Sequence, residues 1–133
     1  RKEIETSKID FNKKINFLKP LGFFDYVKLQ QSSKVVLSDS GTINEESSIL
    51  NFPALNIRDS HERPEGMEEG AVMMTAFNYQ RIKQCIKILE FQSSCRKRLL
   101  LQVSDYSAPN VSDKIVRIIH SYIDYVNKVV WKK

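Results

Sequence analysis

The chain has 133 residues, of which 41% are hydrophobic and 28% are charged. This balance is that of one globular domain, and it excludes a disordered, collagen-like or coiled-coil chain. No apolar run approaches the roughly 18–20 residues that cross a bilayer, so no membrane span and no membrane partner are expected. The chain begins with Arg1, and no signal peptide is predicted.

The net charge of +5 is distributed unevenly along the chain. Residues 39–70 carry two basic and eight acidic side chains, a local net charge of −6. Both flanks are basic: residues 1–38 carry eight basic and four acidic side chains, and residues 78–133 carry eleven basic and four acidic ones. A nucleic-acid-binding protein is expected to place its basic face on its most structured motif. Because the best motif lies in the acidic segment, we expect no nucleic-acid partner and interpret the basic flanks as solvated surfaces.

The two cysteines do not indicate a metal site. Cys85 and Cys95 form no CxxC pair and have no histidines close by, whereas zinc needs about four ligands at short spacings. Cys85 shares an apolar stripe with Ile82 and Leu89, which predicts a buried, reduced thiol. A reducing, cytoplasmic location fits this prediction.

Short apolar runs alternate with helical patterns over most of the chain. The expected elements, in chain order, are a strand at 15–18, a helix at 23–31, a strand at 34–37, a helix at 43–50, a strand at 54–57, a short helix between Pro64 and Gly70, a strand at 71–75 and a helix at 79–91. Proline suits the first position of a helix and glycine its C-terminal end, and these two residues bound the short helix. Strands that alternate with helices predict an α/β fold, a parallel sheet with helices on both sides.

The tail of the chain differs from this pattern. Between residues 111 and 131 apolar side chains recur every three or four residues, at Ile115, Ile118, Ile119, Tyr122, Tyr125, Val126, Val129 and Val130. This spacing predicts a long C-terminal helix of about 20 residues over 111–131, with Asn110 as its N-cap and Asp113 in its first turn. Such a helix can cross a domain or reach a neighbour, and its apolar faces predict self-association or a homo-oligomer.

The segment Ser38-Asp39-Ser40-Gly41-Thr42 joins a buried strand directly to a helix. The first turn of a helix offers unpaired backbone N–H groups and a positive dipole end, which suit a phosphate. Ser40 and Thr42 add hydroxyl donors, and Gly41 permits an unusual backbone angle. The same residues also fit an ordinary turn capped by Ser40 or Thr42, and the pattern alone leaves both interpretations open. The loop is neither GxGxxG nor a Walker loop.

Two further side chains are candidates for a nucleotide site. Glu46, one turn into the helix, can accept two hydrogen bonds from a ribose diol, or it can simply be a favourable charge near a helix N-terminus. Arg63 lies in the loop at 58–66, which follows the strand at 54–57 and is expected beside the first loop. Its guanidinium could clamp a phosphate, pair with Glu46 or Glu62, or form an ordinary surface salt bridge.

Both loops resemble one enzyme family. The run Ser38-Asp39-Ser40-Gly41-Thr42-Ile43-Asn44-Glu45-Glu46, then Phe52-Pro53-Ala54-Leu55 and Arg58 through Gly66, is similar to the non-hydrolysing UDP-N-acetylglucosamine 2-epimerases. Their matching stretch has the form S/T-D-S-G-G/T-I-x-E-E, followed by a proline-led strand and an E-R-P-E turn. The tail at 111–131 looks like the capsule and O-antigen branch, whose members act on the route to UDP-N-acetyl-L-fucosamine.

The resemblance implies two Rossmann-like domains that face a cleft, the GT-B architecture. Residues 1–133 would be the C-terminal part of the UDP-binding domain, without its first βα units and without the N-terminal domain. The substrate-binding residues implied are Ser40, Gly41 and Thr42 for the diphosphate, Glu46 for the ribose, Arg63 for the nucleotide–phosphate pocket, and the backbone near Leu21 with the ring of Tyr26 for uracil.

The reaction implied is inversion at C2 of a UDP-N-acetylhexosamine. Elimination of UDP gives a 2-acetamidoglycal, and UDP then adds back on the other face. No metal or redox cofactor is implied. The acid/base carboxylates of the family belong to its N-terminal domain and a further histidine lies upstream of this segment, so no catalytic residue is expected in this chain and it is predicted to be inactive alone.

Two other interpretations remain open. The chain could be a non-catalytic nucleotide-binding or assembly module from a split or decayed gene, pairing with another chain through its long C-terminal helix. It could also belong to a sugar-transferring enzyme of the same architecture, although the linked D-S-G-T-I-x-E-E and E-R-P-E motifs argue against this.

Overall fold

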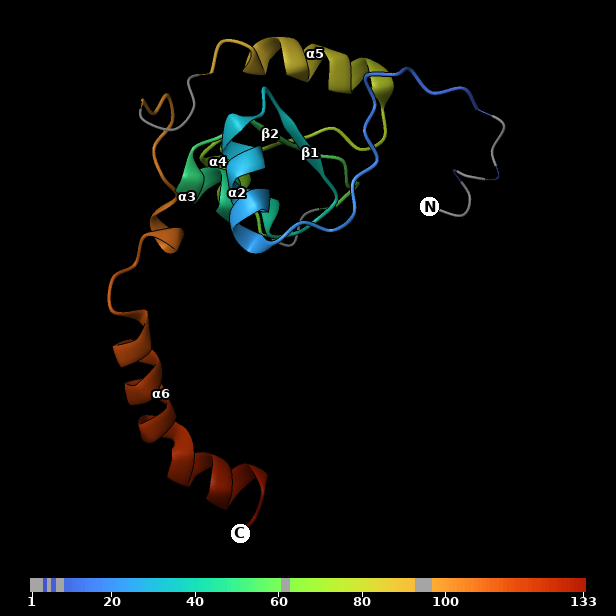
Figure 1. The fold of residues 1–133 in the computed structure, drawn as a ribbon. Helices are drawn as coiled ribbons and strands as arrows, with labels where there is room; N and C mark the ends of the chain where they lie inside the picture. Colours follow the sequence, from blue (N-terminus) through green and yellow to red (C-terminus); the bar gives the residue numbers. More distant parts are fainter. Residues whose placement is uncertain (1–3, 5, 7–8, 61–62, 93–96) are drawn as a thin grey trace.

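The computed structural model describes residues 4, 6, 9–60, 63–92 and 97–133. Helices and strands alternate as the sequence predicts (Figure 1). The elements are α2 (Phe23–Ser32), β1 (Val36–Ser38), α3 (Ile43–Leu50), β2 (Ala54–Asn56), α4 (Glu65–Glu68), β3 (Met73–Met74), α5 (Tyr79–Leu89), the 3-10 turn η1 (Ser104–Tyr106), α6 (Val111–Tyr125) and the π-helical turn η2 (Val126–Val130).

The three strands form one parallel sheet in the order β1-β2-β3. Leu55 of β2 lies opposite Leu37 on one side and Met73 on the other. β2 is therefore the central strand, and all three of its residues are buried.

Helices cover both faces of this sheet, which confirms the predicted α/β class. Successive residues of a strand point to opposite faces. Ala54 packs with Ile43 of α3 and with Phe52 and Val72 on one face. Leu55 packs on the other face with α5 (Figure 1), through the cluster that contains Cys85 and Leu89. The predicted burial of Cys85 is confirmed, since its side chain is only 6% exposed; Cys95 lies outside the described residues.

The strand expected at 15–18 is wrong. Residues 15–18 have no strand pairing; they follow a turn at residues 13–14, which the amide of Ile15 closes by donating to the carbonyl of Asn12 at 2.9 Å. Phe17 packs edge-on against Phe11, with ring centroids 5.2 Å apart. A short apolar run becomes a strand only where a neighbouring strand completes its hydrogen bonds. No described strand lies beside this one.

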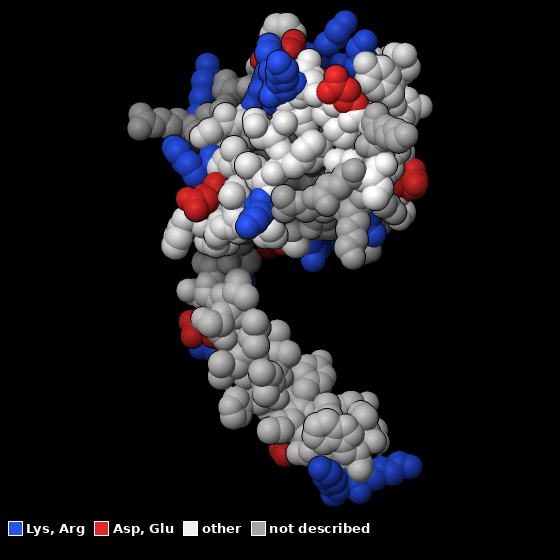
Figure 2. Space-filling model, turned by 45° about the vertical axis from the view of Figure 1, so that its right-hand side comes forward, with Lys and Arg blue, Asp and Glu red and all other residues white. Residues whose placement is uncertain are grey.

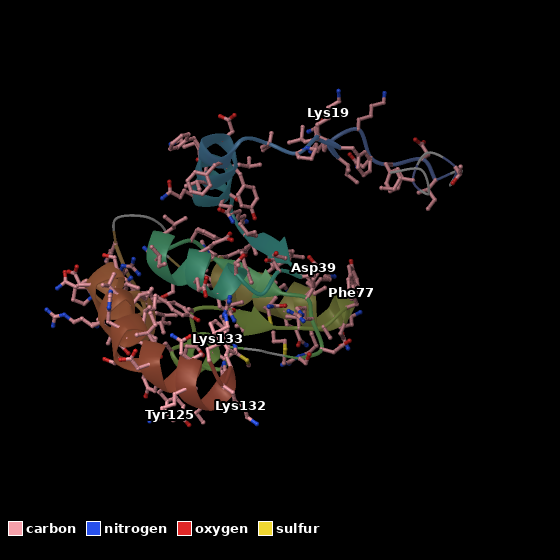
Figure 3. All side chains as sticks on the ribbon, turned by 90° about the horizontal axis from the view of Figure 1, so that it is seen from below. Lys19, Asp39, Phe77, Tyr125, Lys132 and Lys133 are labelled. Atoms are coloured by element: carbon pink, nitrogen blue, oxygen red, sulfur yellow. The ribbon has the colours of Figure 1, made fainter. Side chains whose placement is uncertain are left out.

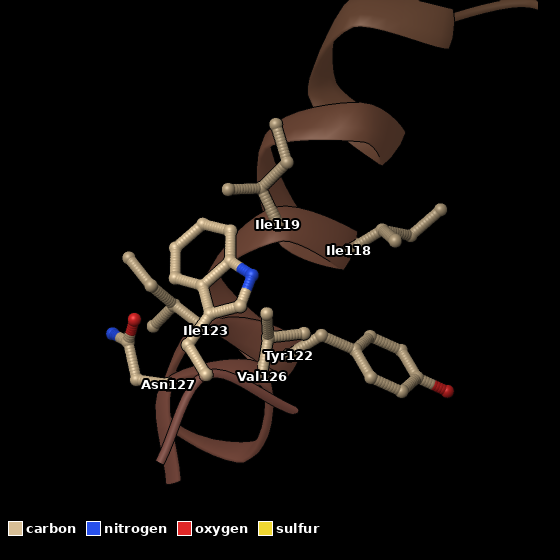
Figure 4. A pocket seen from close by; sticks show the side chains of 7 residues that line it. Ile118, Ile119, Tyr122, Ile123, Val126 and Asn127 are labelled. Atoms are coloured by element: carbon tan, nitrogen blue, oxygen red, sulfur yellow. The ribbon is translucent and has the colours of Figure 1, made fainter. Parts of the chain in front are cut away.

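The predicted C-terminal helix is confirmed as α6, which continues into η2 and projects from the globular part (Figure 1). Its apolar side chains are about half exposed, as in Ile119 at 56% and Tyr122 at 59%. The π-helical turn η2 is capped by Trp131, whose amide donates to the carbonyl of Val126 at 3.0 Å. Figure 4 shows an apolar hollow at this end of the tail, lined by Ile118, Ile119, Tyr122, Ile123, Val126, Asn127 and Trp131.

Asn110 occupies the expected N-cap position of this helix but does not cap it with its side chain. Asn110 does precede α6, but it has left-handed backbone angles (φ 57°, ψ 38°) and its side chain makes no capping hydrogen bond. A capping side chain needs extended backbone angles to reach the first turn.

Within the described part of the chain, no helix is both long enough and apolar enough to cross a bilayer. On the face drawn in Figure 2, basic and acidic side chains are interspersed over the globular part, and basic side chains gather at the C-terminal end of the tail.

Candidate functional site

The loop after β1 is held by its own hydroxyl groups. The backbone N–H of Ser40 donates to Oγ of Ser38 at 3.0 Å, and the N–H of Thr42 donates to Oγ of Ser40 at 3.3 Å. The hydroxyls of Ser40 and Thr42 lie 2.9 Å apart. The loop therefore enters α3 with its hydroxyl groups already ordered, at the carboxyl end of the sheet where open α/β folds bind ligands.

Gly41 and Thr42 do not use the backbone angle and the side-chain cap that the sequence left open for them. Gly41 does not adopt a positive φ, which among the described glycines only Gly70 does, at 68°. Gly70 thus supplies the helix-ending geometry expected of it after α4. Thr42 is the N-cap of α3, but it has helical backbone angles and its side chain makes no capping bond. Its hydroxyl donates instead to Oε1 of Glu46, at 2.7 Å.

Glu46 is held by two different elements. Oε1 accepts from Thr42 at the start of α3, and Oε2 accepts from the side-chain amide of Gln30 on α2. An ionised carboxylate has about four acceptor positions, so each oxygen still has a free lone pair. The carboxylate can therefore accept two further hydrogen bonds, as binding a ribose diol requires.

Arg63 joins the second loop to the first. Its Nη1 donates to the carbonyl of Gly41 at 3.2 Å and forms an ion pair with Oε1 of Glu45 at 2.9 Å. The pairing with Glu46 considered from the sequence is wrong, and Glu62 lies outside the described residues. Consecutive helix residues point about 100° apart. Glu45 consequently faces the Arg63 loop while Glu46 faces α2.

The second loop is anchored by close packing under α4. A Cβ atom on Gly66 would lie 2.9 Å from Cβ of Asn44, so only glycine fits there. The side-chain amide of Asn44 donates to the carbonyl of Arg63 at 3.4 Å. The hydroxyl of Tyr106, from η1, donates to Oε1 of Glu65 at 2.9 Å. These contacts fix the position from which Arg63 reaches the first loop.

A cavity of about 590 Å³ lies between α2 and α3. Three of the predicted site residues line it together, namely Tyr26, Thr42 and Glu46. Its full lining is Phe23, Phe24, Tyr26, Val27, Gln30, Thr42, Glu45, Glu46, Ile49 and Leu50. The lining is mostly aromatic and aliphatic, with a few hydrogen-bonding groups from both helices, which suits a ligand with a flat ring and hydroxyls. Leu21 is outside this lining; it immediately precedes Gly22, the N-cap of α2.

The surroundings of Tyr26 disfavour loss of its hydroxyl proton. Burial raises the pKa of Tyr26 above its ordinary value, and the nearby carboxylate of Glu46 raises it further. Both effects disfavour a phenolate. Tyr26 therefore offers the cavity a neutral ring with an O–H group.

A second hollow of about 600 Å³ lies at the same edge of the sheet. Asp39 after β1 and Phe77 after β3 border it, side by side in Figure 3, together with Ile57, Arg58, Asp59 and Ser60. Among the described residues, no group of three or more histidine, cysteine, aspartate or glutamate side chains could hold a metal ion.

A sequence model of the UDP-N-acetylglucosamine 2-epimerase family matches residues 1–120. The chain belongs to this family. Both predicted loops, at 38–42 and 58–66, fall within the matched region.

Individual epimerases agree with this assignment. The chain is similar to the UDP-N-acetylglucosamine 2-epimerase of Methanocaldococcus jannaschii, 34% identical over 62% of this chain and 22% of the relative, and to that of Bacillus subtilis, 29% identical over 84% and 30%. The solved Rickettsia bellii epimerase is 52% identical with a TM-score of 0.82, over 90% of this chain and 33% of that one. The Methanocaldococcus jannaschii enzyme solved with UDP-GlcNAc and UDP gives 30% identity and a TM-score of 0.70, over 83% and 29%. The chain spans about a third or less of the length of these epimerases.

Sequence reasoning missed two residues of this epimerase-family site. Gln30 continues the inward face of α2 three residues after Val27, where an apolar residue would be expected, and this break in the pattern was the available signal. Tyr106 lies 41 residues from Glu65 in the sequence, and no local pattern predicts that contact.

We predict that Tyr106 makes the stability of this epimerase-family chain fall at high pH. Burial and the hydrogen bond to Glu65 raise the pKa of Tyr106 to about 12. The unfolded tyrosine loses its proton near pH 10, so stabilisation that is complete below pH 10 is lost as the pH rises to about 12. Urea unfolding from pH 8 to 12 should show a smaller decline for Tyr106→Phe than for the wild type. Tyr125→Phe, in the exposed tail, is the matched control, and equal declines in all three proteins would contradict the assignment.

Proposed function

We propose that this chain is the UDP-binding part of a UDP-N-acetylglucosamine 2-epimerase. The observation that carries the proposal is the convergence of Tyr26, Thr42 and Glu46 on one cavity beside the ordered hydroxyl loop. Residues 1–133 are assigned to the C-terminal part of the UDP-binding domain. The Methanocaldococcus jannaschii relative, solved with UDP-GlcNAc and UDP, supports this choice of ligand.

The chemistry of each group fits one part of UDP. The diphosphate is assigned to Ser40, Gly41 and Thr42 at the N-terminus of α3, where the helix dipole favours an anion. To hold it, the amides and hydroxyls of Ser40 and Thr42 would exchange their present partners within the chain for phosphate oxygens. Glu46 accepts the two ribose hydroxyls through its free lone pairs. The ring of Tyr26 and the backbone near Leu21 hold uracil.

The acidic surroundings of the loop need compensation before a diphosphate can bind. Asp39 lies within the loop and Glu45 in the first turn of α3, and the ion pair with Arg63 compensates the charge of Glu45. Arg63 thus favours the phosphate by neutralising one like charge beside the loop.

The whole enzyme would invert C2 of a UDP-N-acetylhexosamine. A base removes the C2 proton while the C1–oxygen bond breaks, giving a 2-acetamidoglycal and UDP; UDP then adds back to C1 and a proton returns to the opposite face of C2. The residues of this chain are assigned to the binding of UDP during this reaction. The proton transfers are assigned to the part of the family's length that this chain does not span. The tail pattern favours the capsule and O-antigen branch, in the cytoplasm.

UDP should bind to the chain, and Glu46→Ala should weaken that binding about a hundredfold or more. Each hydrogen bond to a charged acceptor contributes about 1.5–3 kcal/mol, and the substitution removes two. Isothermal titration calorimetry with UDP provides the measurement. Glu68→Ala removes an exposed carboxylate from α4 and serves as the matched control. Equal affinities of wild type and Glu46→Ala would refute the ribose assignment.

The chain alone should not epimerise UDP-N-acetylglucosamine. With the proton-transfer groups assigned elsewhere, neither a manno product nor exchange of the C2 proton with deuterated water is expected in proton NMR spectra. Turnover by this chain would show that the catalytic groups lie within these 133 residues.

The exposed stripe of α6 favours a second candidate, an assembly module. In this case the chain associates through the tail, and self-association measured by light scattering should rise with concentration. Ile119→Glu should move the midpoint of association about tenfold higher in concentration, because burying an isoleucine side chain contributes about 1.5–3 kcal/mol. Ser121→Glu adds the same charge on the polar side of the helix and should have little effect. A monomer at every concentration would exclude this mode of assembly.

A further inference from the structure

Gln30 is an unusual residue for its place in the fold. It belongs to α2, and its side chain is only 3% exposed. It lines the cavity between α2 and α3 beside Tyr26 and Glu46. Glutamine is mostly exposed in proteins, so a buried one needs a reason beyond filling space.

The reason lies in its contact with Glu46. The side-chain amide of Gln30 donates to Oε2, while Thr42 donates to Oε1 of the same carboxylate. A glutamate has three rotatable side-chain bonds, and a donor on one oxygen alone leaves the carboxylate plane free to turn. Donors from two elements, one on each oxygen, fix both its position and its plane.

The side-chain oxygen of Gln30 shows that the contact with Glu46 sets the orientation of the Gln30 amide. Oε1 of Gln30 is buried and has no hydrogen-bond partner among the described residues. A buried acceptor without a partner lowers stability. Turning the amide over would instead place Oε1 against the carboxylate of Glu46, where two acceptors repel each other. A leucine or methionine would avoid the cost entirely, so the fold alone does not call for glutamine here.

We propose that Gln30 is a positioning residue that sets the carboxylate plane of Glu46 for two adjacent hydroxyls of a ribose. The inference deepens the proposed function and rests on it, because it requires Glu46 to bind the ribose. Gln30 is assigned to Glu46 rather than to the ligand, because its amide already donates to Oε2; its effect passes through Glu46. The effect is therefore expected in the selectivity for the 2′-hydroxyl rather than in affinity for the diphosphate.

The test compares UDP with 2′-deoxyuridine diphosphate by calorimetry, using the full chain. The wild type should bind UDP about tenfold or more tightly, because the deoxy ligand lacks one hydrogen bond to a charged acceptor. Gln30→Met keeps the length of the side chain and removes the donor. It should reduce this preference about three- to tenfold, with the affinity for the deoxy ligand nearly unchanged. In the Glu46→Ala background, Gln30→Met should no longer alter the preference.

Two controls separate positioning from a general structural effect. Gln84→Met makes the same chemical change at an exposed position of α5, and it should leave the preference unchanged. Gln30→Leu is a second variant of similar volume, with the same loss expected, should Gln30→Met not unfold cooperatively.

The outcomes of the calorimetry distinguish the role of Gln30 from the ribose assignment of Glu46. If the wild type prefers UDP and both Gln30 variants keep that preference, or lose affinity for both ligands equally, the role of Gln30 is overturned and the UDP site stands. If the wild type binds neither ligand, or binds both equally, the ribose assignment of Glu46 fails, and the role of Gln30 fails with it.

Discussion

The burial of β2 on both faces is the constraint on which the rest of the molecule depends. Ala54 and Leu55 are fully buried on opposite sides, and β2 pairs with β1 along one edge and with β3 along the other. A parallel strand covered in this way needs a helix layer on each face. It also brings the loops after β1 and β2 to the same edge, which is how residues 23 positions apart, Ser40 and Arg63, come to share one site.

The adjacent carboxylates of Glu45 and Glu46 on α3 have different partners, because consecutive side chains of a helix point about 100° apart. Glu45 points to the second loop and is neutralised by Arg63, whereas Glu46 points to α2 and keeps lone pairs for a ligand. Within the acidic segment at the centre of the sequence, Glu45 thus forms an ion pair with Arg63, and Glu46 is the carboxylate that we propose for the ribose. The ion pair of Glu45 with Arg63 lowers the negative charge that an anionic ligand would meet beside the loop.

The sequence predicts local features of this fold well and contacts between distant segments poorly. The helix at 43–50 has the bounds expected of it, because its apolar spacing and flanking turn residues are local signals. The strand expected at 15–18 depends on a neighbour that periodicity cannot supply. The same limit applies to Arg63, whose choice of Glu45 follows from the rotation of α3, and to Gln30, whose partner lies 16 residues away.

The attachment of α2 to the rest of the fold has a consequence for the cavity between α2 and α3. All ten residues of α2 are described, and Gln30 alone is buried, while Phe23 and Phe24 are 74% and 84% exposed. The helix thus meets the rest of the fold through a polar contact beside an apolar-walled space. A flat ring in that space would give the aromatic side of α2 something to pack against. The ligand would then complete the hydrophobic core between two helices, and the stability of this part of the molecule would depend on whether the site is filled.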